Sequence, residues 1–411
     1  MARTILPRKD DRSSAKIFAV LISIEEGRER VLGAVGSLGS ERVALADARA
    51  RVLAEDLTSA VDVPPFDSSA MDGFALEAGP ARALDVSGEA RAGHPHEAEL
   101  MPGTAVRIST GAAVPAGATA VIPVERTSEN GARVEVEETR TGANIRRAGE
   151  DLRAGDVVLA AGTLLGPAEL GVAASVGRAE LVCARRPRVA LLVTGDELVQ
   201  PGEPLRPGQI YSSNGFALAA QVAAAGGELA LRETVPDSAA GTHAALERAL
   251  GAADVLIASG GVSVGPHDHV KGALRELGVE ERFWGVALRP GKPTWFGARG
   301  DTLVFGLPGN PVSAMVTFQL FVAPALAALQ GADPSPRRAP ATLDEPVARN
   351  PRREQAVRVR LRHAADGLHA LTTGEQGSHM LSSMLGADGL ARVAPGEGEL
   401  AAGERVEVLL L

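Results

Sequence analysis

A chain of 411 residues, 45% of them hydrophobic, is long enough for two to four domains and apolar enough to form packed cores, which excludes general disorder. Its formal net charge of −9, without a long block of Lys and Arg, argues against a nucleic-acid binder. The single cysteine, Cys183, excludes an intrachain disulfide and a multi-thiolate metal site, and no run of roughly 20 apolar residues that would span a bilayer is evident. We therefore expect a soluble, cytoplasmic protein with no nucleic acid and no membrane among its partners.

The first predicted element is a helix that follows a polar extension. Ser23 and Glu26 have the spacing of a capping box, and the apolar residues after them recur at helical intervals to about Leu38. Residues before about Lys16 are polar and charged, so we expect a loose extension there.

Short strands are predicted between residues 43 and 183. Brief apolar runs alternate there with Gly, Pro and Asn turns, which is typical of an all-β region. The runs lie at residues 86–87, 105–108, 120–124, 134–136, 157–160 and 179–182.

Strands and helices alternate from residue 188 to about residue 330. This rhythm predicts right-handed crossovers and a parallel, doubly wound sheet. The predicted strands are 189–193, 229–235, 255–259, 283–288 and 303–307, and the predicted helices lie near 214–225, 238–250, 268–277 and 311–329.

A linker with three prolines, residues 331–340, marks the next boundary. Beyond it, strand-like runs at 356–361, 368–371 and 405–411 without a long helical period predict a small β domain.

Candidate functional residues follow the predicted strands of the α/β segment, because ligands of doubly wound sheets bind at the carboxyl ends of the strands. Thr194, Gly195, Asp196 and Glu197 follow one strand. The run 259–265 after another strand holds three glycines and two serines, which lets backbone N–H groups approach an anion.

Two further loops leave the same predicted edge. Arg289 and Lys292 bring two cations into a turn stiffened by proline, which suits a compact oxyanion. Asn310 and Pro311 fit the cap and first position of a helix whose positive end attracts phosphate.

Each of these loops has an ordinary structural explanation when it is taken alone. They could be an acidic helix start, a flexible turn, a solvated basic turn and a plain helix cap. Four such loops at one edge predict instead a site for a phosphate-bearing ligand.

The β-rich region also carries polar clusters. The run Asp-Ser-Ser that begins at Asp67 could form an ordinary turn. However, a turn does not require a second aspartate, Asp72, five residues later and next to Met71. The runs 109–112 and 144–151 are weaker clusters of the same kind.

Together these residues resemble the MoeA family, the molybdopterin molybdenumtransferases, which also form the C-terminal part of gephyrin. The matching motifs occur in family order at residues 65–73, 144–151, 194–198, 260–268, 290–293, 306–313 and 377–381. Ser68 and Arg289 depart from the family pattern, where Asn and Lys are frequent, and residues 1–20 have no counterpart.

The resemblance implies a multidomain fold of α/β plus all-β type and a homodimer. Its domains would be an N-terminal extension and helix (1–39) that packs with the α/β molybdopterin-binding domain (184–334), a connecting β domain (40–52 and 152–183), an inserted β domain (53–151) and a C-terminal β barrel (335–411). The active site would combine the α/β and C-terminal domains of one subunit with the inserted domain of the other.

The implied reaction inserts molybdate into adenylylated molybdopterin and releases AMP, with Mg²⁺ as cofactor and molybdate as substrate. Molybdenum would be bound by the sulfurs of the pterin substrate. The adenylyltransferase of the pathway and molybdoenzyme chaperones are the implied partner proteins.

Site residues are carried over motif by motif. The implied catalytic residues are Asp67, Asp151, Glu197 and Asp268, and the implied metal ligands are Asp67, Asp72, Asp196, Glu197 and Asp268. Substrate would be bound by Thr110, Arg146, Thr194, Gly195, Gly260, Gly261, Ser263, Gly265, Gly309, Asn310 and Ser313. Molybdate would be bound by Arg289, Lys292, Pro293, Arg358 and Ser378.

Two other functions compete with this hypothesis. A molybdopterin adenylyltransferase shares the Gly-Gly loop but needs neither residues 43–183 nor the C-terminal domain. A non-catalytic dimeric scaffold of gephyrin type would not need to retain the acidic and basic motifs.

Overall fold

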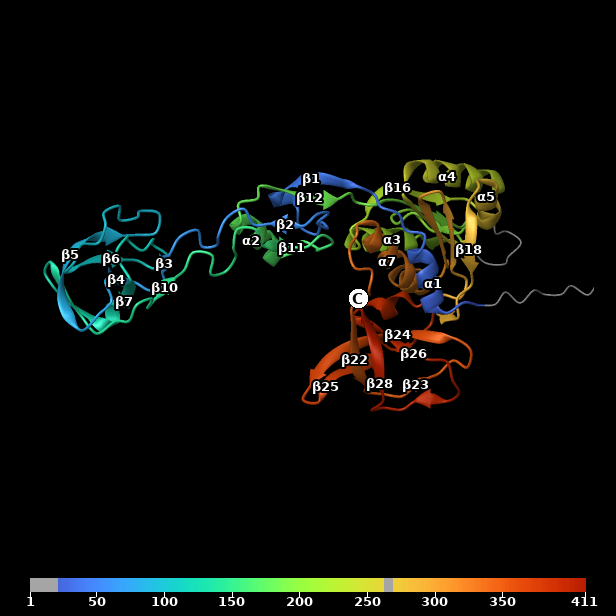
Figure 1. Ribbon diagram of the computed structural model, residues 1–411. Coiled ribbons are helices and arrows are strands. Elements are labelled where there is room, and N and C mark those ends of the chain that lie inside the picture. Colours follow the sequence, from blue (N-terminus) through green and yellow to red (C-terminus); the bar gives the residue numbers. More distant parts are fainter. Residues whose placement is uncertain (1–20, 262–268) are drawn as a thin grey trace, which may run out of the picture. The chain divides into compact units, whose positions relative to one another are not determined.

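The computed structural model describes residues 21–261 and 269–411. The chain divides into two compact units (Figure 1). The first unit consists of Met1–Leu38 and Arg185–Leu411, and the second unit is Gly39–Ala184. The predicted N-terminal extension and the predicted site residues Ser263, Gly265 and Asp268 lie outside the described residues.

A six-stranded sheet forms the centre of the first unit, in the order β16-β13-β17-β21-β20-β18. Its strands are β13 (Arg188–Thr194), β16 (Glu228–Val235), β17 (Val255–Ser259), β18 (Glu280–Trp284), β20 (Trp295–Arg299) and β21 (Thr302–Leu307). The pairs β13–β16, β13–β17 and β17–β21 are parallel, whereas β20 runs antiparallel to both β21 and β18. Since β18 is thereby parallel to β21, the segment after β18 leaves the same edge of the sheet as the segments after β13, β17 and β21.

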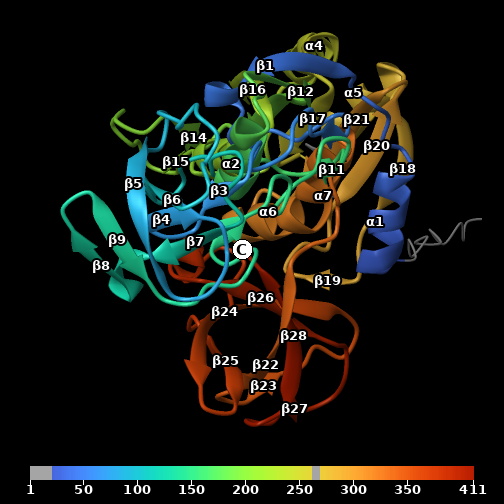
Figure 2. The same cartoon turned by 60° about the vertical axis from the view of Figure 1, so that its left-hand side comes forward.

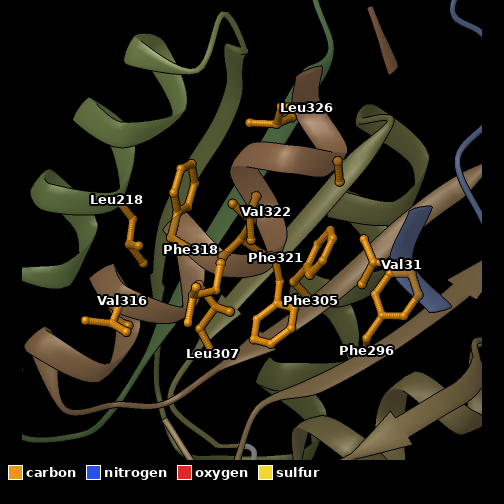
Figure 3. Packing of buried hydrophobic residues seen from close by; sticks show 14 of the residues in the cluster. Val31, Leu218, Phe296, Phe305, Leu307, Val316, Phe318, Phe321, Val322 and Leu326 are labelled. Atoms are coloured by element: carbon orange, nitrogen blue, oxygen red, sulfur yellow. The ribbon is translucent and has the colours of Figure 1, made fainter. Parts of the chain in front are cut away.

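Helices cover both faces of this sheet, which confirms the doubly wound α/β fold. One face packs against α1 (Ile24–Leu32), α3 (Asn214–Ala224) and the continuous helix Pro311–Leu329, which contains α6 (Pro311–Thr317), the π-helical η3 (Phe318–Val322) and α7 (Ala323–Leu329). The other face packs against α4 (Ala239–Ala252) and α5 (Val270–Glu276). Figure 3 shows the first of these cores, where Phe305 and Leu307 of β21 meet Phe318 and Phe321.

The Pro311–Leu329 helix is apolar because it is a core helix. It is the one helix among the described residues that is long and apolar enough to span a bilayer, contrary to the sequence prediction. However, 72% of its most apolar window is buried inside the protein, which accounts for the apolar residues.

A closed β barrel follows in the first unit, which confirms the predicted C-terminal barrel. The five strands close in the order β24-β25-β22-β28-β26, with β26 returning to β24, and the short β19 (Leu288–Arg289) adds to the outside of β24. They are β22 (Arg338–Leu343), β24 (Glu354–Ala364), β25 (Gly367–Thr372), β26 (Gly389–Val393) and β28 (Arg405–Leu410). In Figure 2 these strands surround a common centre, which small aliphatic side chains fill.

The second unit is mostly β, as predicted. Its main sheet has the order β7-β4-β6-β5-β9-β8, with β4 (Gly73–Leu76), β5 (Arg82–Ala90), β6 (Thr104–Ile108), β7 (Ala120–Pro123), β8 (Thr127–Asn130) and β9 (Arg133–Val136). Three two-stranded pairs complete it: β1 (Ser40–Ala44) with β12 (Glu180–Ala184), β2 (Leu57–Thr58) with β11 (Val157–Leu159), and β3 (Ser68–Ser69) with β10 (Ile145–Arg146). One helix, α2 (Pro167–Ser175), is present here although the sequence analysis predicts only strands.

Two other elements differ from the sequence prediction. Helix α1 ends at Leu32 rather than near Leu38, with Gly33 as its C-cap, because glycine weakens the helix there. The predicted strand 283–288 is divided between β18 and β19. Strand β20 was not predicted, because Trp295–Arg299 shows no alternation of apolar and polar residues.

Candidate functional site

A cavity of about 650 Å³ opens at the carboxyl edge of the α/β sheet. Segments after β13, after β21 and before α3 line it together with the C-terminal segment after β25. The lining residues include Thr194, Glu197, Ile210, Tyr211, Asn214, Ser259, Pro293, Gly309, Asn310 and His379. The carboxyl edge of the sheet, where the sequence predicts the site, is therefore hollow. Among the predicted site residues, Thr194, Glu197, Gly309 and Asn310 line the cavity.

Gly260 and Gly261 lie close against neighbouring residues at this edge. Both have positive φ, +92° and +65°. A Cβ on Gly260 would lie 2.8 Å from the carbonyl oxygen and from Oγ1 of Thr194, and a Cβ on Gly261 would lie 2.6 Å from Val270. Any larger residue would be strained at these two positions, because φ is positive and a Cβ would meet Thr194 or Val270.

Thr194 contributes a polar atom without a partner. Its Oγ1 is buried and has no hydrogen-bond partner among the described residues. Because a buried unpaired hydroxyl is costly, such an atom at the wall of a cavity is typical of a ligand contact.

The start of the Pro311–Leu329 helix is joined to the C-terminal domain. Asn310 is the N-cap, as predicted, but its side chain makes no capping bond. Its Nδ2 donates to Ser378 Oγ at 3.0 Å, and the N–H of Val312 donates to the carbonyl of Ser378 at 3.2 Å. Ser313, a predicted substrate contact, is only 4% exposed on the first turn.

The predicted carboxylates of the first unit lie in different surroundings. Glu197 is exposed at the cavity, and its carboxylate lies over Gly195, where a Cβ would be within 2.6 Å of it. Asp196 does not line the cavity and accepts a hydrogen bond from the N–H of Asp237 at 2.9 Å. Among the described residues no group of three His, Cys, Asp or Glu could hold a metal ion.

Arg358, a predicted molybdate ligand, is fully buried in the barrel. Its guanidinium donates to the carbonyls of Glu375, Gln376 and Gly377 and to Ser383 Oγ. Desolvation lowers the pKa of Arg358 to about 10, and no carboxylate within the described ranges pairs with it. The cation thus supports the segment that carries Ser378 to the start of the Pro311–Leu329 helix.

The other predicted molybdate ligands are spread over two cavities. Arg289 is exposed and lines, with Arg358, a second cavity of about 230 Å³ in the first unit. Arg289 also lies near Arg353. Desolvation lowers the pKa of Arg353, and the charge of Arg289 lowers it further. Lys292 is exposed, and Pro293 lines the larger cavity.

In the second unit, the predicted ligands Asp67 and Asp72 accept hydrogen bonds from residues of the same unit. Asp67 accepts hydrogen bonds from the N–H of Ala148 at 2.9 Å and from Arg147 at 2.5 Å, and these contacts, the first above all, lower its pKa. Asp72 accepts from the N–H of Thr110 at 2.7 Å.

The remaining predicted residues of the second unit are Arg146 and Asp151, at and just after the pair of strands β3 and β10. Arg146 pairs with Ser68 between β10 and β3, and Asp151 is exposed beyond them. The structure therefore groups Asp67 with Arg147 and Asp72 with Thr110.

Three residues that line the larger cavity, and one more at the same edge of the sheet, were not predicted from the sequence. Asn214, Tyr211 and His379 line it, and Asp237 follows β16 at the same edge of the sheet. Asp237 could have been found by the rule that selected the other loops, since it follows a predicted strand. Tyr211 and Asn214 follow no long strand and had no such signal.

The chain matches three family descriptions in sequence order. They are "MoeA N-terminal region (domain I and II)" over residues 22–177, "Probable molybdopterin binding domain" over residues 190–328, and "MoeA C-terminal region (domain IV)" over residues 340–411.

Curated proteins and solved structures resemble it over almost the whole chain. It is 37% identical to the molybdopterin molybdenumtransferase of Haemophilus influenzae over 94% of this chain and 98% of that protein. It is 38% identical to molybdopterin molybdenumtransferase 2 of Mycobacterium tuberculosis, again over 94% and 98%. The crystal structure of the molybdopterin biosynthesis MoeA protein from Pyrococcus horikoshii superposes with a TM-score of 0.82 at 29% identity, covering 95% of this chain and 100% of that one.

Proposed function

The chain belongs to the MoeA family of molybdopterin molybdenumtransferases, and we propose that it inserts molybdate into adenylylated molybdopterin with release of AMP. The observation that carries this proposal is the 650 Å³ cavity, which is lined by Gly309, Asn310 and Thr194, whose hydroxyl has no partner among the described residues. A substrate of two ring systems joined by a pyrophosphate needs a cavity of this size with donors for its central anion.

The pyrophosphate would be bound by backbone. The N–H of Gly260 is bound to the carbonyl of Leu307, so the turn would offer the N–H of Gly261, while the positive end of the Pro311–Leu329 helix supplies a favourable potential for phosphate oxygens. Tyr211, whose hydroxyl donates to the carbonyl of Glu203 at 3.0 Å, presents an aromatic wall suited to a purine or pterin ring.

The molybdate dianion would be bound by cations of the basic segment and the 289–293 turn. Residues 335–363 hold eight Arg against three acidic residues, in a chain with a net charge of −9. Lys292 and Arg289 are exposed cations of this turn that would approach the anion, whereas Arg358 acts by holding the segment that carries Ser378.

The residues present fit a Mg²⁺ ion that is shared with the substrate. Mg²⁺ in phosphate chemistry takes one or two carboxylates from the protein and its other ligands from phosphates and water. Glu197 and the unpaired Oγ1 of Thr194 are hard oxygen donors at the larger cavity. Mg²⁺ bound there would neutralise phosphate charge, and we propose Glu197 as its main protein ligand, with the other predicted carboxylates as further candidates.

We also propose that the protein acts as a homodimer in the cytoplasm and exchanges substrate and product with the adenylyltransferase and with molybdoenzyme chaperones. The family resemblance supports the dimer, and a single cysteine that is buried is compatible with a reducing compartment. Light scattering after size-exclusion chromatography tests the dimer.

The reaction is tested by incubating the pure protein with adenylylated molybdopterin, Mg²⁺ and molybdate and measuring AMP. We expect AMP release to require both ions. Equal release without molybdate would identify a simple pyrophosphatase. Conversion of molybdopterin and ATP to the adenylylated pterin would identify an adenylyltransferase instead.

A further inference from the structure

Asn214 joins two loops that are far apart in the sequence. It is the first residue of α3 and only 8% exposed. Its Nδ2 donates to Ser259 Oγ at 2.9 Å and to the carbonyl of Gly309 at 2.8 Å. The carbonyl can only accept, so the orientation of the amide follows from the contacts.

The two loops are joined a second time by Ser259. Its hydroxyl donates to the carbonyl of Pro308 at 3.3 Å, while the N–H of Gly260 donates to the carbonyl of Leu307 at 3.1 Å. A Cβ built on Gly309 would lie 3.7 Å from the Cα of Gly260. The Gly260–Gly261 turn and the Gly309–Asn310 turn therefore lie side by side.

Only an amide meets all of these contacts. A side-chain NH₂ has two hydrogens, and here each has its own acceptor. A carboxylate of the same shape has none and would face the Gly309 carbonyl with a second oxygen. Each turn belongs to the proposed phosphate site, so the amide sets the distance between the two groups of backbone donors.

We propose that Asn214 is a positioning residue that holds the two phosphate-binding turns at the separation that the pyrophosphate of the adenylylated substrate requires. This inference rests on the proposed function. Asn214 would determine affinity for the nucleotide-bearing substrate and not the molybdate requirement. It lies outside the family motifs that were recognised in the sequence.

The decisive variant is Asn214→Asp. It keeps the shape of the side chain, but it removes both donors and places a largely buried carboxylate against the Gly309 carbonyl, so the melting temperature should fall and KM is the decisive readout. Without its two donors, we expect KM for adenylylated molybdopterin to rise about 10- to 100-fold, as for the loss of buried hydrogen bonds and the displacement of a binding group. The molybdate concentration for half-maximal AMP release should stay unchanged. Asn214→Ala should raise KM similarly and also lower the melting temperature.

Gln221 supplies the matched control. It lies on the same helix, is 9% exposed, and donates to the carbonyl of Met315 at 3.3 Å, but it does not line the cavity. Gln221→Ala should lower the melting temperature and leave KM unchanged.

The outcomes separate this inference from the function it rests on. If the unmodified protein shows no molybdate-dependent AMP release, the proposed function and the inference both fall. If the unmodified protein is active and Asn214→Asp keeps its KM, or Gln221→Ala raises KM as much as Asn214→Ala does, the inference alone is wrong. A shift in the molybdate requirement of Asn214→Asp would also overturn it.

Discussion

Arg358 and Arg392 lie on the neighbouring strands β24 and β26 of the same barrel, in opposite surroundings. Arg358 is fully buried against carbonyl groups, and desolvation lowers its pKa to about 10. Arg392 forms ion pairs with Glu354, Glu25 and Glu407, and these raise its pKa, with the hydrogen bond to Glu354 contributing most.

The same contrast separates two regions of the first unit. Around the cavities, the charges of Glu197, Lys292 and Arg358 form no ion pair with another described residue. Away from the cavities, several charges are paired. Arg392 connects α1 to the barrel through Glu25, and His369 lies between Asp344 and Asp366. We propose Glu197 and Lys292 as ligand contacts and assign a structural role to the ion pairs of Arg392, so the two regions should respond differently to substitution.

The largest effect is expected for Glu197→Gln. The change keeps size and hydrogen-bonding capacity but removes the charge proposed for Mg²⁺ and pyrophosphate. Turnover should fall about 100- to 1,000-fold, as when a group that stabilises transition-state charge is lost. The loss should be the same at every molybdate concentration, with an unchanged melting temperature because Glu197 has no ion pair among the described residues. Rescue by excess molybdate would contradict the division of the site.

Lys292→Ala should act on molybdate instead. Removal of one charge-assisted contact costs about 1.5–3 kcal/mol, which corresponds to a roughly 10- to 150-fold rise in the molybdate requirement. Excess molybdate should restore part of the activity. A molybdate titration of AMP release measures this, and an unchanged half-saturation would show that Lys292 does not face the anion.

Arg392→Met should change stability and not catalysis. It leaves Glu354, whose side chain is 18% exposed, without its partner, and we expect a loss of about 1.5–3 kcal/mol of unfolding free energy. Urea unfolding followed by tryptophan fluorescence measures this loss. If KM or the molybdate requirement changed as well, the paired region would not be purely structural.

The smallest effect concerns pH. Hydrogen bonds to Asp344 and then Asp366 raise the pKa of His369 from its ordinary value of 6.5, while the pKa values of both aspartates are lowered from 3.8. The imidazolium therefore stabilises the barrel fully below pH 6.5, and this contribution is lost as the pH rises through the raised pKa. The aspartates add stability that is lost only as the pH falls through their lowered values.

Melting temperatures from pH 5 to pH 9 test this prediction. The unmodified protein should lose more stability than His369→Gln above pH 6.5, because glutamine does not titrate. Equal slopes for the two proteins would contradict it.

Much of the fold was predictable because it depends on local pattern. The alternation of strand and helix periods in residues 188–330 predicted the doubly wound sheet, and the short runs around it predicted the β regions. Strand β20 and helix α2 escaped prediction, because Trp295–Arg299 has no alternation and Pro167–Ser175 is mostly small residues between turns.

The sequence by itself determined which turns could approach an anion, since it shows that Gly260, Gly261 and Gly309 follow predicted strands. Only the tertiary structure decided how those turns are spaced and supported. Asn214 reaches Ser259 and Gly309, which lie 45 and 95 residues away, and Arg358 holds the segment before Ser378 by its carbonyls. Such contacts depend on the order of the strands in the sheet and on which polar side chains become buried when the chain folds. Local sequence periodicity predicts neither of these.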